Sequence, residues 1–396
     1  MIVRRAGLIV VAVSTLAFAG AHRDVPVTAA SFDDPCLDGD ACQHHALDAF
    51  RDAFAAQRAG SADHPLRISY FGDSLTADDH ITGALREKLQ ALVGDGGPGF
   101  VFAAPPHPYC QHRAVARVVS EGWHAHGIST VVPPDRLLGL GGDAECDGGG
   151  TIRFAPDGAV SSIDVHYLAQ PHGGTFDIVA DGKVVTTVAT ANTDKHGLFA
   201  GAPLPDGTRH VELRARGRVR LFGATPETGK GAVVDNLGVV NATAKQMHNN
   251  NLAEHWKNQL AHRAPDLVVI MYGTNEAEWL HPRGAGMAEH EKLFGELLAD
   301  VRTALPDASC LVVSPLDQID TLDDKPRDSI PAMVAAQRRA ALANGCAFWD
   351  TYAWMGGKGA SRTWYRRGLV VKDYQHPTTE GAELIANALY AGLVER

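Results

Sequence analysis

The chain has 396 residues, 45% of them hydrophobic, and a formal net charge of −10 at pH 7. The acidic balance argues against nucleic acids and anionic membranes as partners. No segment after the N-terminal region is apolar over the ~20 residues that a membrane span needs, so no stable membrane anchor is predicted.

Residues 1–21 have the pattern of a secretory signal peptide. Arg4 and Arg5 precede an apolar run, and small residues that suit cleavage near Ala19 or Ala21 follow it. The apolar run is too short to span a bilayer. The mature protein is therefore expected to be secreted or periplasmic.

The chain has six cysteines, and an even number behind an export signal favours disulfides. Pairing between sequence neighbours is expected: Cys36 with Cys42, Cys110 with Cys146, and Cys310 with Cys346. The last pair is the best argued, because both cysteines begin short apolar runs that suit adjacent parallel strands. A zinc site is the competing interpretation for Cys110 and the histidines around it, although none of the spacings is convincing for zinc. These histidines are His107, His112, His124 and His126.

Residues 22–65 predict an N-terminal extension with one helix over Leu47–Arg58. A strand over Leu66–Gly72 follows, then Ser74 on a tight turn, then a helix over Ile81–Val93. The glycines of Gly94–Gly99 match a dinucleotide-binding spacing. They follow a helix rather than a strand, so we interpret them as a loop.

The region 105–230 is expected to be a β-rich insert. Helical periodicity disappears there, and Asp181-Gly182 between two alternating runs strongly predicts a hairpin. Asp206-Gly207 marks a second turn. A small β-sandwich of the carbohydrate-binding kind fits this pattern, and both substrate binding and simple stabilisation are open as its role. The predicted strands are Thr151–Phe154, Ser162–Ala169, Thr175–Ala180, Lys183–Thr190, Thr208–Ala215 and Val219–Gly223.

The remaining chain alternates strands and helices, which predicts βαβ units around a parallel sheet. The expected strands lie at Leu267–Tyr272, Cys310–Ser314 and Cys346–Asp350, and the expected helices at Met247–His262, Met287–Ala304, Pro331–Ala343 and Thr378–Leu393.

Three polar side chains have the identities that nucleophilic catalysis needs. A serine hydroxyl attacks a carbonyl only when an imidazole takes its proton and a carboxylate fixes the imidazole tautomer. Ser74 follows the first strand, and Asp373 and His376 are three residues apart in a turn before the last helix. Gly238 and Asn275 each follow an apolar run, where an amide N–H could stabilise an oxyanion.

Four blocks containing these residues resemble the SGNH (GDSL) hydrolase family. They are Gly72-Asp73-Ser74-Leu75, Asp235-Asn236-Leu237-Gly238, Gly273-Thr274-Asn275 and Asp373-Tyr374-Gln375-His376. The resemblance covers Leu66–Phe102 and residues 231–396.

The resemblance implies a three-layer α/β domain with a flavodoxin-like parallel sheet, formed by residues 66–104 and 231–396. It makes Ser74 the nucleophile, His376 the base and Asp373 its partner, with Ser74 N–H, Gly238 N–H and the Asn275 side chain as the oxyanion hole. Glu276 departs from the Asp that is usual in the family. No metal and no cofactor are implied.

The region Gly94–Phe102, the surroundings of Trp123 and Gly139-Leu140-Gly141-Gly142 look similar to the peptidoglycan and polysaccharide O-acetylesterases of this family. The expected function is therefore removal of O-acetyl groups from an acetylated polysaccharide by a serine esterase. Acetyl transfer to a sugar and hydrolysis of small esters or lipids are the alternatives. A carbohydrate-binding protein without activity is disfavoured, because no position of the triad is missing. Aromatic residues before the last helix, Trp354, Trp364 and Tyr365, either line the site or pack against it.

Overall fold

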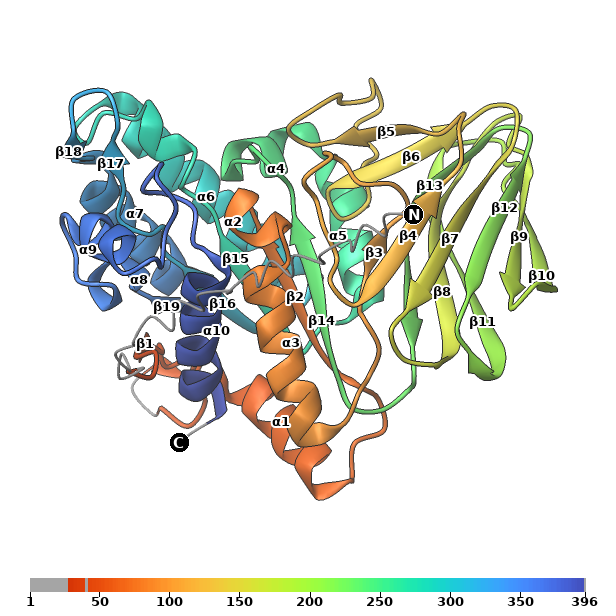
Figure 1. Ribbon diagram of the computed structural model, residues 1–396, viewed down its shortest axis with the longest axis horizontal. Helices are drawn as coiled ribbons and strands as arrows, with labels where there is room; N and C mark the ends of the chain where they lie inside the picture. The colour runs from red at the N-terminus through yellow and green to blue at the C-terminus, as the bar shows by residue number, and fades with distance from the viewer. Residues whose placement is uncertain (1–27, 40–41, 395–396) are drawn as a thin grey trace, which may run out of the picture.

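The computed structural model describes residues 28–39 and 42–394, so the expected signal peptide lies outside the described residues. Figure 1 shows a part with helices around a sheet, on the left, and a part made of β-strands, on the right. The chain enters the β-rich part after the first crossover helix and returns to the α/β part near residue 232.

The α/β part is built on one sheet in the order β1-β19-β16-β15-β2-β14. Five strands are parallel, and their order is the 2-1-3-4-5 order of flavodoxin-like sheets. After β2, the chain adds β14 on one side of this strand and then adds the later strands on the other side. The position beside β2 is therefore the topological switch point. The five strands are β2 (Leu66–Gly72), β14 (Ala232–Gly238), β15 (Leu267–Met271), β16 (Ser309–Val313) and β19 (Ala347–Trp349).

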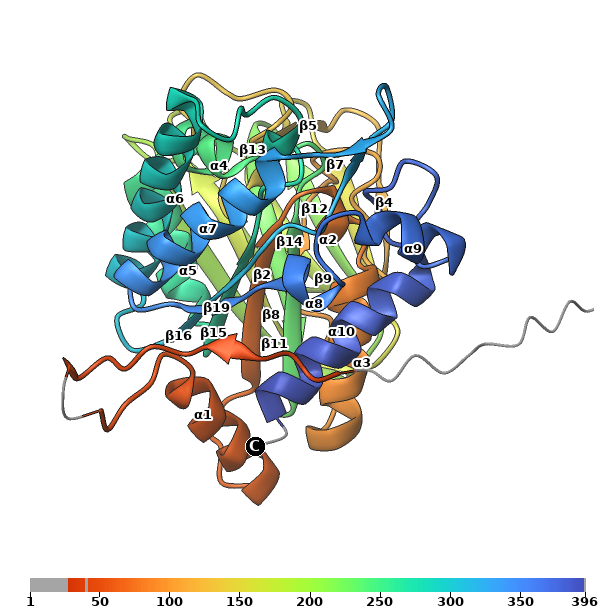
Figure 2. The same ribbon diagram turned by 90° about the vertical axis from the view of Figure 1, so that its left-hand side faces the viewer.

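Helices cover both faces of this sheet, as Figure 2 shows. Alternate strand residues point to opposite faces, so Val269 belongs to one core cluster while Val268 and Ile270 belong to the other. One face is covered by α1 (Asp48–Ala59), α3 (His80–Val93) and α10 (Thr379–Val394). The other is covered by α5 (Ala253–Arg263), α6 (Ala285–Ala304) and α7 (Ser329–Ala343). The predicted three-layer arrangement is confirmed.

Short elements complete the α/β part. The extension adds β1 (Phe32–Asp33), which pairs antiparallel with β19 at the sheet edge. The others are α2 (Ser74–Ala77), α4 (Ala244–Asn250), the 3₁₀ helix η2 (Glu276–Glu278), β17 (Ile319–Asp320), β18 (Lys325–Pro326), α8 (Thr351–Trp354) and α9 (Ala360–Arg366).

The β-rich part has two antiparallel sheets with one hydrophobic core between them, which includes Phe154 from one sheet and Val165 from the other. One sheet has the order β10-β9-β12-β7-β4, with β4 (Val115–Val119), β7 (Gly150–Pro156), β9 (Thr175–Ala180), β10 (Lys183–Ala189) and β12 (Val211–Arg216). The other has the order β11-β8-β13-β6-β5, with β5 (His124–Gly127), β6 (Gly142–Cys146), β8 (Val160–Ala169), β11 (His196–Thr208) and β13 (Val219–Glu227). The short strand β3 (Val101–Phe102) pairs with β13.

Of the two turns predicted in the β-rich part, one is present and the other is not. Asp181 and Gly182 both have positive φ, 43° and 84°, and connect β9 to β10 as predicted. Asp206-Gly207 instead lies within β11, where the pairing with β8 shifts register between Pro203 and Thr208. The segment therefore bulges rather than turns, because β8 continues beside it.

The single helix predicted over Met247–His262 is two helices, α4 and α5. Asn251 between them is extended, with φ −108° and ψ 140°. Its side chain accepts a hydrogen bond from Leu138 N at 3.3 Å and donates one to Gly139 O at 2.8 Å. A side chain that serves a distant loop fixes this break, so helical periodicity could not reveal it.

Two of the three expected disulfides are present. Cys36–Cys42 closes a short loop, and Cys310–Cys346 joins the neighbouring parallel strands β16 and β19, where Leu311 is paired with Ala347. The predicted Cys110–Cys146 bond is wrong, because both residues are buried free thiols. Cys146 is paired with Val219 in the β6–β13 ladder, whereas Cys110 N–H bonds to His107 O in a loop. Sequence proximity does not bring these two thiols together.

A buried ionic cluster joins the two parts. The guanidinium of Arg263 on α5 donates to Asp235 on β14 at 2.8 and 2.9 Å and to Glu227 on β13 at 2.6 Å. Arg67 on β2 also donates to Glu227, at 2.8 Å. The charges of the cluster are thus compensated inside the protein.

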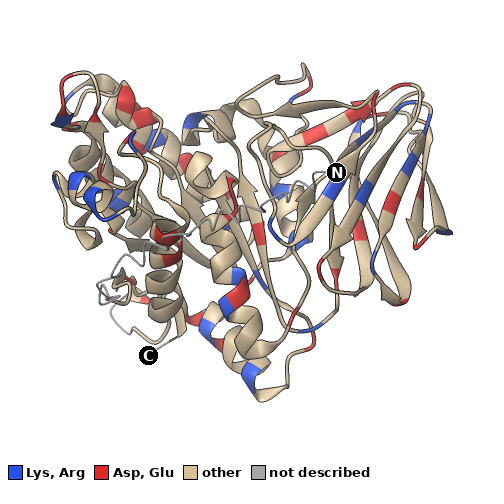
Figure 3. Ribbon diagram, in the orientation of Figure 1, with Lys and Arg blue, Asp and Glu red and all other residues tan. Residues whose placement is uncertain are grey.

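Acidic and basic residues are interspersed over both parts of the molecule (Figure 3). Among residues 28–39 and 42–394, no helix has the length and apolar character to cross a membrane. The two disulfides fit an extracellular protein.

Candidate active site

Ser74 lies at the carboxyl end of β2, at the switch point of the sheet, where it begins α2. Asp73 caps this helix by accepting a hydrogen bond from Leu75 N at 3.0 Å. The turn needs a glycine before it, because a Cβ on Gly72 would lie 2.2 Å from Thr76 Oγ1 and 2.9 Å from Met271 O. The Gly-Asp-Ser sequence thus places the serine hydroxyl at the sheet edge.

The structure brings Ser74, His376 and Asp373 together, although 302 residues separate the serine and the histidine. Ser74 Oγ lies 2.8 Å from His376 Nε2, and His376 Nδ1 lies 2.7 Å from Asp373 Oδ2. The other carboxylate oxygen of Asp373 accepts from Gln375 N at 2.8 Å and from His376 N at 3.0 Å. The carboxylate therefore fixes both the turn and the imidazole.

An unusual backbone conformation completes this turn. Tyr374 has φ 59°, in the left-handed region, and its ring packs edge-on against Tyr365 of α9 at 5.0 Å. Tyr365 therefore packs against the turn. Trp364 is buried in the core, and the rings of Trp349 and Trp364 pack against Trp354, so the two tryptophans of this group serve packing.

The hydrogen bond that His376 donates to Asp373 is the main cause that raises the pKa of His376 above its ordinary value. Burial alone would raise the pKa of Asp373, but the hydrogen bonds from His376 and Gln375 N–H together with the charge of His376 lower it. The two shifts agree, since each partner stabilises the charged form of the other. Water reaches the pair, because the two side chains are 39% and 43% exposed.

The three expected oxyanion donors have different hydrogen-bond states. Ser74 N–H is in the first turn of α2, where backbone N–H groups have no acceptor within the helix. Asn275 uses one amide hydrogen to reach Ala242 O at 2.8 Å, which leaves the second for a ligand. Gly238 N–H donates to Asn236 Oδ1 at 3.1 Å, so an oxyanion would have to displace that bond.

Gly238 has a clear packing role as well. A Cβ at this position would lie 2.3 Å from Ala77 N, so only glycine lets β14 approach α2. The Asn236 side chain that accepts from Gly238 also donates to Gln111 O at 3.1 Å. This asparagine therefore ties the loop before β4 to the site, a role that sequence reasoning missed.

Two buried acids next to the site were also missed. Burial is the main cause that raises the pKa of Asp73 to about 6 and that of Glu276 to about 8. Glu276 Oε1 accepts from Ala244 N, the first residue of α4, at 2.9 Å. The glutamate thus caps a neighbouring helix. In the sequence, Glu276 was marked only as a departure from the family's usual Asp, and Asp73 only as the residue before Ser74.

The zinc interpretation of Cys110 and its neighbouring histidines has no support in the structure. Among the residues that the structure describes, one group of three potential ligands comes together, and it contains none of them.

In open α/β sheets, ligands bind outside the carboxyl ends of the strands at the switch point, and Ser74 lies at this position. Residues 204–384 match the model of the GDSL-like lipase/acylhydrolase family. The chain therefore contains a hydrolase domain of the GDSL (SGNH) family. It is a serine hydrolase that acts on ester bonds. The matched range starts in β11 and does not include Ser74. Ser74 nevertheless follows β2, which lies in the same sheet as strands of the matched range.

Among solved structures, the chain is similar to one described as a peptidoglycan O-acetylesterase in action. The identity is 25% and the TM-score 0.75, over 87% of this chain and 95% of that one. A second is an active-site mutant of a family two carbohydrate esterase from Clostridium thermocellum. It has 12% identity and a TM-score of 0.29, over 68% of this chain and 97% of that one. No curated protein sequence matches the chain.

Proposed function

We propose that the protein is a serine esterase that removes O-acetyl groups from peptidoglycan or a similar extracellular polysaccharide. The observation that carries this proposal is the hydrogen-bonded series Ser74–His376–Asp373 at the switch point of the sheet. The polymer is inferred from the similarity to a peptidoglycan O-acetylesterase, which extends over 87% of the chain and so has to include part of residues 105–230.

In this mechanism, His376 Nε2 takes the proton from Ser74 Oγ as the oxygen attacks the acetyl carbonyl. Ser74 N–H and Asn275 would stabilise the oxyanion, with Gly238 as the third donor once its bond to Asn236 is released. His376 then gives its proton to the sugar oxygen as the ester bond breaks, which leaves an acetyl-enzyme. Water attacks the acetyl-enzyme with His376 as base again, and acetate leaves.

Hydrolysis is favoured over acetyl transfer because solvent reaches His376 and Asp373. A transferase has to keep water away from its acyl-enzyme, and this site is open.

The division of the chain belongs to the same proposal. Residues 66–104 and 231–396 would form the hydrolase domain, residues 22–65 an extension, and residues 105–230 an inserted sandwich-like domain that binds carbohydrate. The shared core of the two antiparallel sheets supports this division. We also infer a secreted or periplasmic location after removal of residues 1–21, which the two disulfides support.

The test compares acetate release from O-acetylated peptidoglycan, O-acetylated xylan and p-nitrophenyl acetate. We expect most of the activity to disappear in Ser74→Ala and in His376→Ala, and the small residual rate of the double variant to be little lower than that of either, because triad members act as a unit. Peptidoglycan should be the better of the two polymers. Losses that multiply in the double variant would exclude a shared mechanism, and equal rates on both polymers would refute the assigned substrate.

A further inference from the structure

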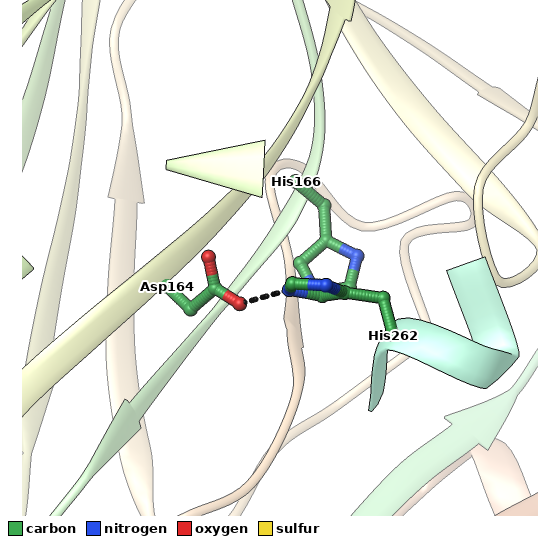
Figure 4. A group of neighbouring side chains, drawn as sticks. All are labelled: Asp164, His166 and His262. Atoms are coloured by element: carbon green, nitrogen blue, oxygen red, sulfur yellow. Dashed lines mark hydrogen bonds and ion pairs between the residues drawn. The ribbon is translucent and has the colours of Figure 1, made fainter. Parts of the chain in front are cut away.

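A second group of chemically competent side chains lies between the two parts of the molecule, outside the triad. Asp164 and His166 come from β8, where a spacing of two residues places both side chains on one face of the sheet. His262 comes from the last turn of α5. Figure 4 shows the three side chains converging.

The geometry suits a metal ion. Each side chain offers one ligand atom, and the three atoms lie within 4.8 Å of one another. His262 Nε2 and Asp164 Oδ2 are already 2.5 Å apart (Figure 4). Two imidazoles and a carboxylate form the donor set of sites for zinc and related transition metals.

The hydrogen bond at His166 Nδ1 leaves the second ring nitrogen, Nε2, available to bind a cation. His166 Nδ1 donates to Gln259 Oε1 at 2.8 Å, which leaves the lone pair on Nε2. His166 is fully buried, and its Nε2 has no hydrogen-bond partner. The second carboxylate oxygen of Asp164, Oδ1, is also buried without a partner. Such atoms are costly unless something binds them.

Surrounding rings hold the imidazoles in place. Phe199 on β11 stacks on His262 with centroids 3.4 Å apart and packs edge-on against His166 at 4.8 Å. The α5 helix comes close to β11 because Gly197 has no side chain, and a Cβ there would lie 2.5 Å from His255. Ligands held this rigidly lose little freedom when they bind an ion.

Access and charge are compatible with a cation. His262 and Asp164 are about one-third exposed and line a cavity of about 520 Å³. The neighbouring Arg263 does not add uncompensated positive charge, since Asp235 and Glu227 pair with it.

We propose that Asp164, His166 and His262 bind one Zn²⁺ ion between β8 and α5, with the remaining coordination positions filled by water from the cavity. The ion replaces the proton shared by Asp164 and His262, and it connects the β-rich part to the α/β part. Its role is to stabilise the junction, because the site is separate from Ser74, His376 and Asp373.

The test uses the full-length mature protein after EDTA treatment and dialysis. With ZnCl₂, we expect one ion per chain by elemental analysis and calorimetry, and a melting temperature that rises with ZnCl₂ concentration but not with MgCl₂. Asp164→Asn preserves the shape of the side chain, and His262→Asn replaces a side chain that is partly exposed. Each should weaken Zn²⁺ binding by at least about a hundredfold, since even loss of an outer-sphere partner costs about 10–100-fold.

His210→Asn is the matched control, because His210 and Asp181 form an exposed pair at 3.2 Å that belongs to no group of three potential ligands within the described part of the chain. This variant should bind Zn²⁺ as tightly as the wild type. The proposal is overturned if the wild type binds no stoichiometric Zn²⁺, or if Asp164→Asn and His262→Asn bind it as tightly as His210→Asn.

Discussion

At the scale of single residues, the site depends on how Asp373 controls His376. The carboxylate receives three hydrogen bonds from the turn that holds the histidine, so it can orient the ring and stabilise its charged form together. As the proposed general base, however, His376 would act only when neutral. A raised pKa therefore limits activity at low pH.

We expect kcat/KM to fall on the acidic side of a midpoint above pH 6.5, because the pKa of His376 is raised above that value. Below the midpoint the rate should drop about tenfold per pH unit, as protonated base accumulates. The pH profile on p-nitrophenyl acetate measures this.

Asp373→Asn removes the main cause of the raised pKa, so the acidic limb should move to lower pH while burial still favours the neutral ring. The kcat value should fall by about 10⁴, because the asparagine supports the wrong tautomer. Asp63→Asn, at an exposed position, is the control. A limb that stays in place would mean that another group than His376 controls it.

Asn275→Ala should lower kcat by about 10²–10³ with little change in KM, as expected for one lost oxyanion donor. Steady-state kinetics on p-nitrophenyl acetate measures both constants, and circular dichroism checks the fold, since Asn275 also bonds to Ala242 O. If KM rose at constant kcat, Asn275 would position the substrate instead.

At the scale of elements, two disulfides hold segments of very different length. Cys310–Cys346 encloses a sequence separation of 36 residues, which includes α7, and Cys36–Cys42 a separation of 6. In the chain-entropy model, longer closed loops stabilise more because they restrict the unfolded chain more.

Replacing Cys310 and Cys346 together by serine should therefore lower the free energy of unfolding by about 4 kcal/mol, against about 2 kcal/mol for Cys36 and Cys42. Urea denaturation of the two double variants measures the difference. A larger loss from the short loop would contradict the entropic explanation.

The thiols give a separate prediction. Because Cys110 and Cys146 are buried, a thiol reagent should label neither in the folded protein and both after denaturation without reductant. Rapid labelling in the folded state, or no labelling after denaturation, would contradict their state in the structure.

At the scale of the whole molecule, hydrogen bonds and ion pairs connect the two parts at several places. Gln111 N bonds to Ala77 O next to Ser74, and Ser129 Oγ to Val240 O, while the Arg263 cluster joins β2, β13, β14 and α5. A single cooperative thermal transition is therefore expected, and calorimetry should give equal calorimetric and van't Hoff enthalpies. Two separated transitions would contradict this coupling.

Arg263→Met should lower the free energy of unfolding by about 3–5 kcal/mol, because it leaves the charge of Asp235 and part of that of Glu227 buried without a cationic partner. Arg339→Met is the control. Arg339 pairs with Glu291 while 61% exposed, and such pairs contribute at most about 1 kcal/mol. Equal losses in the two variants would show that the buried cluster adds no stability to the junction.

Local chemistry in the sequence was sufficient for much of the α/β part. Apolar runs of strand length that alternate with helical periodicity specify a parallel sheet, and the residues after these runs specify candidates for the site. Asp181-Gly182 also specified its hairpin, because both positions need positive φ. The Cys310–Cys346 bond followed from the expectation that their strands are neighbours.

Only the tertiary structure decided the features that depend on distant partners. Asn251 ends α4 because it binds the loop at Leu138 and Gly139, and Asp206-Gly207 does not turn because β8 runs beside it. Gly238 N–H already has an acceptor in Asn236. The group of Asp164, His166 and His262 forms because α5 packs on β11 and its side chains reach β8, a contact that no local pattern encodes. The sequence therefore determined which residues could react, and the packing of distant elements determined which of them meet.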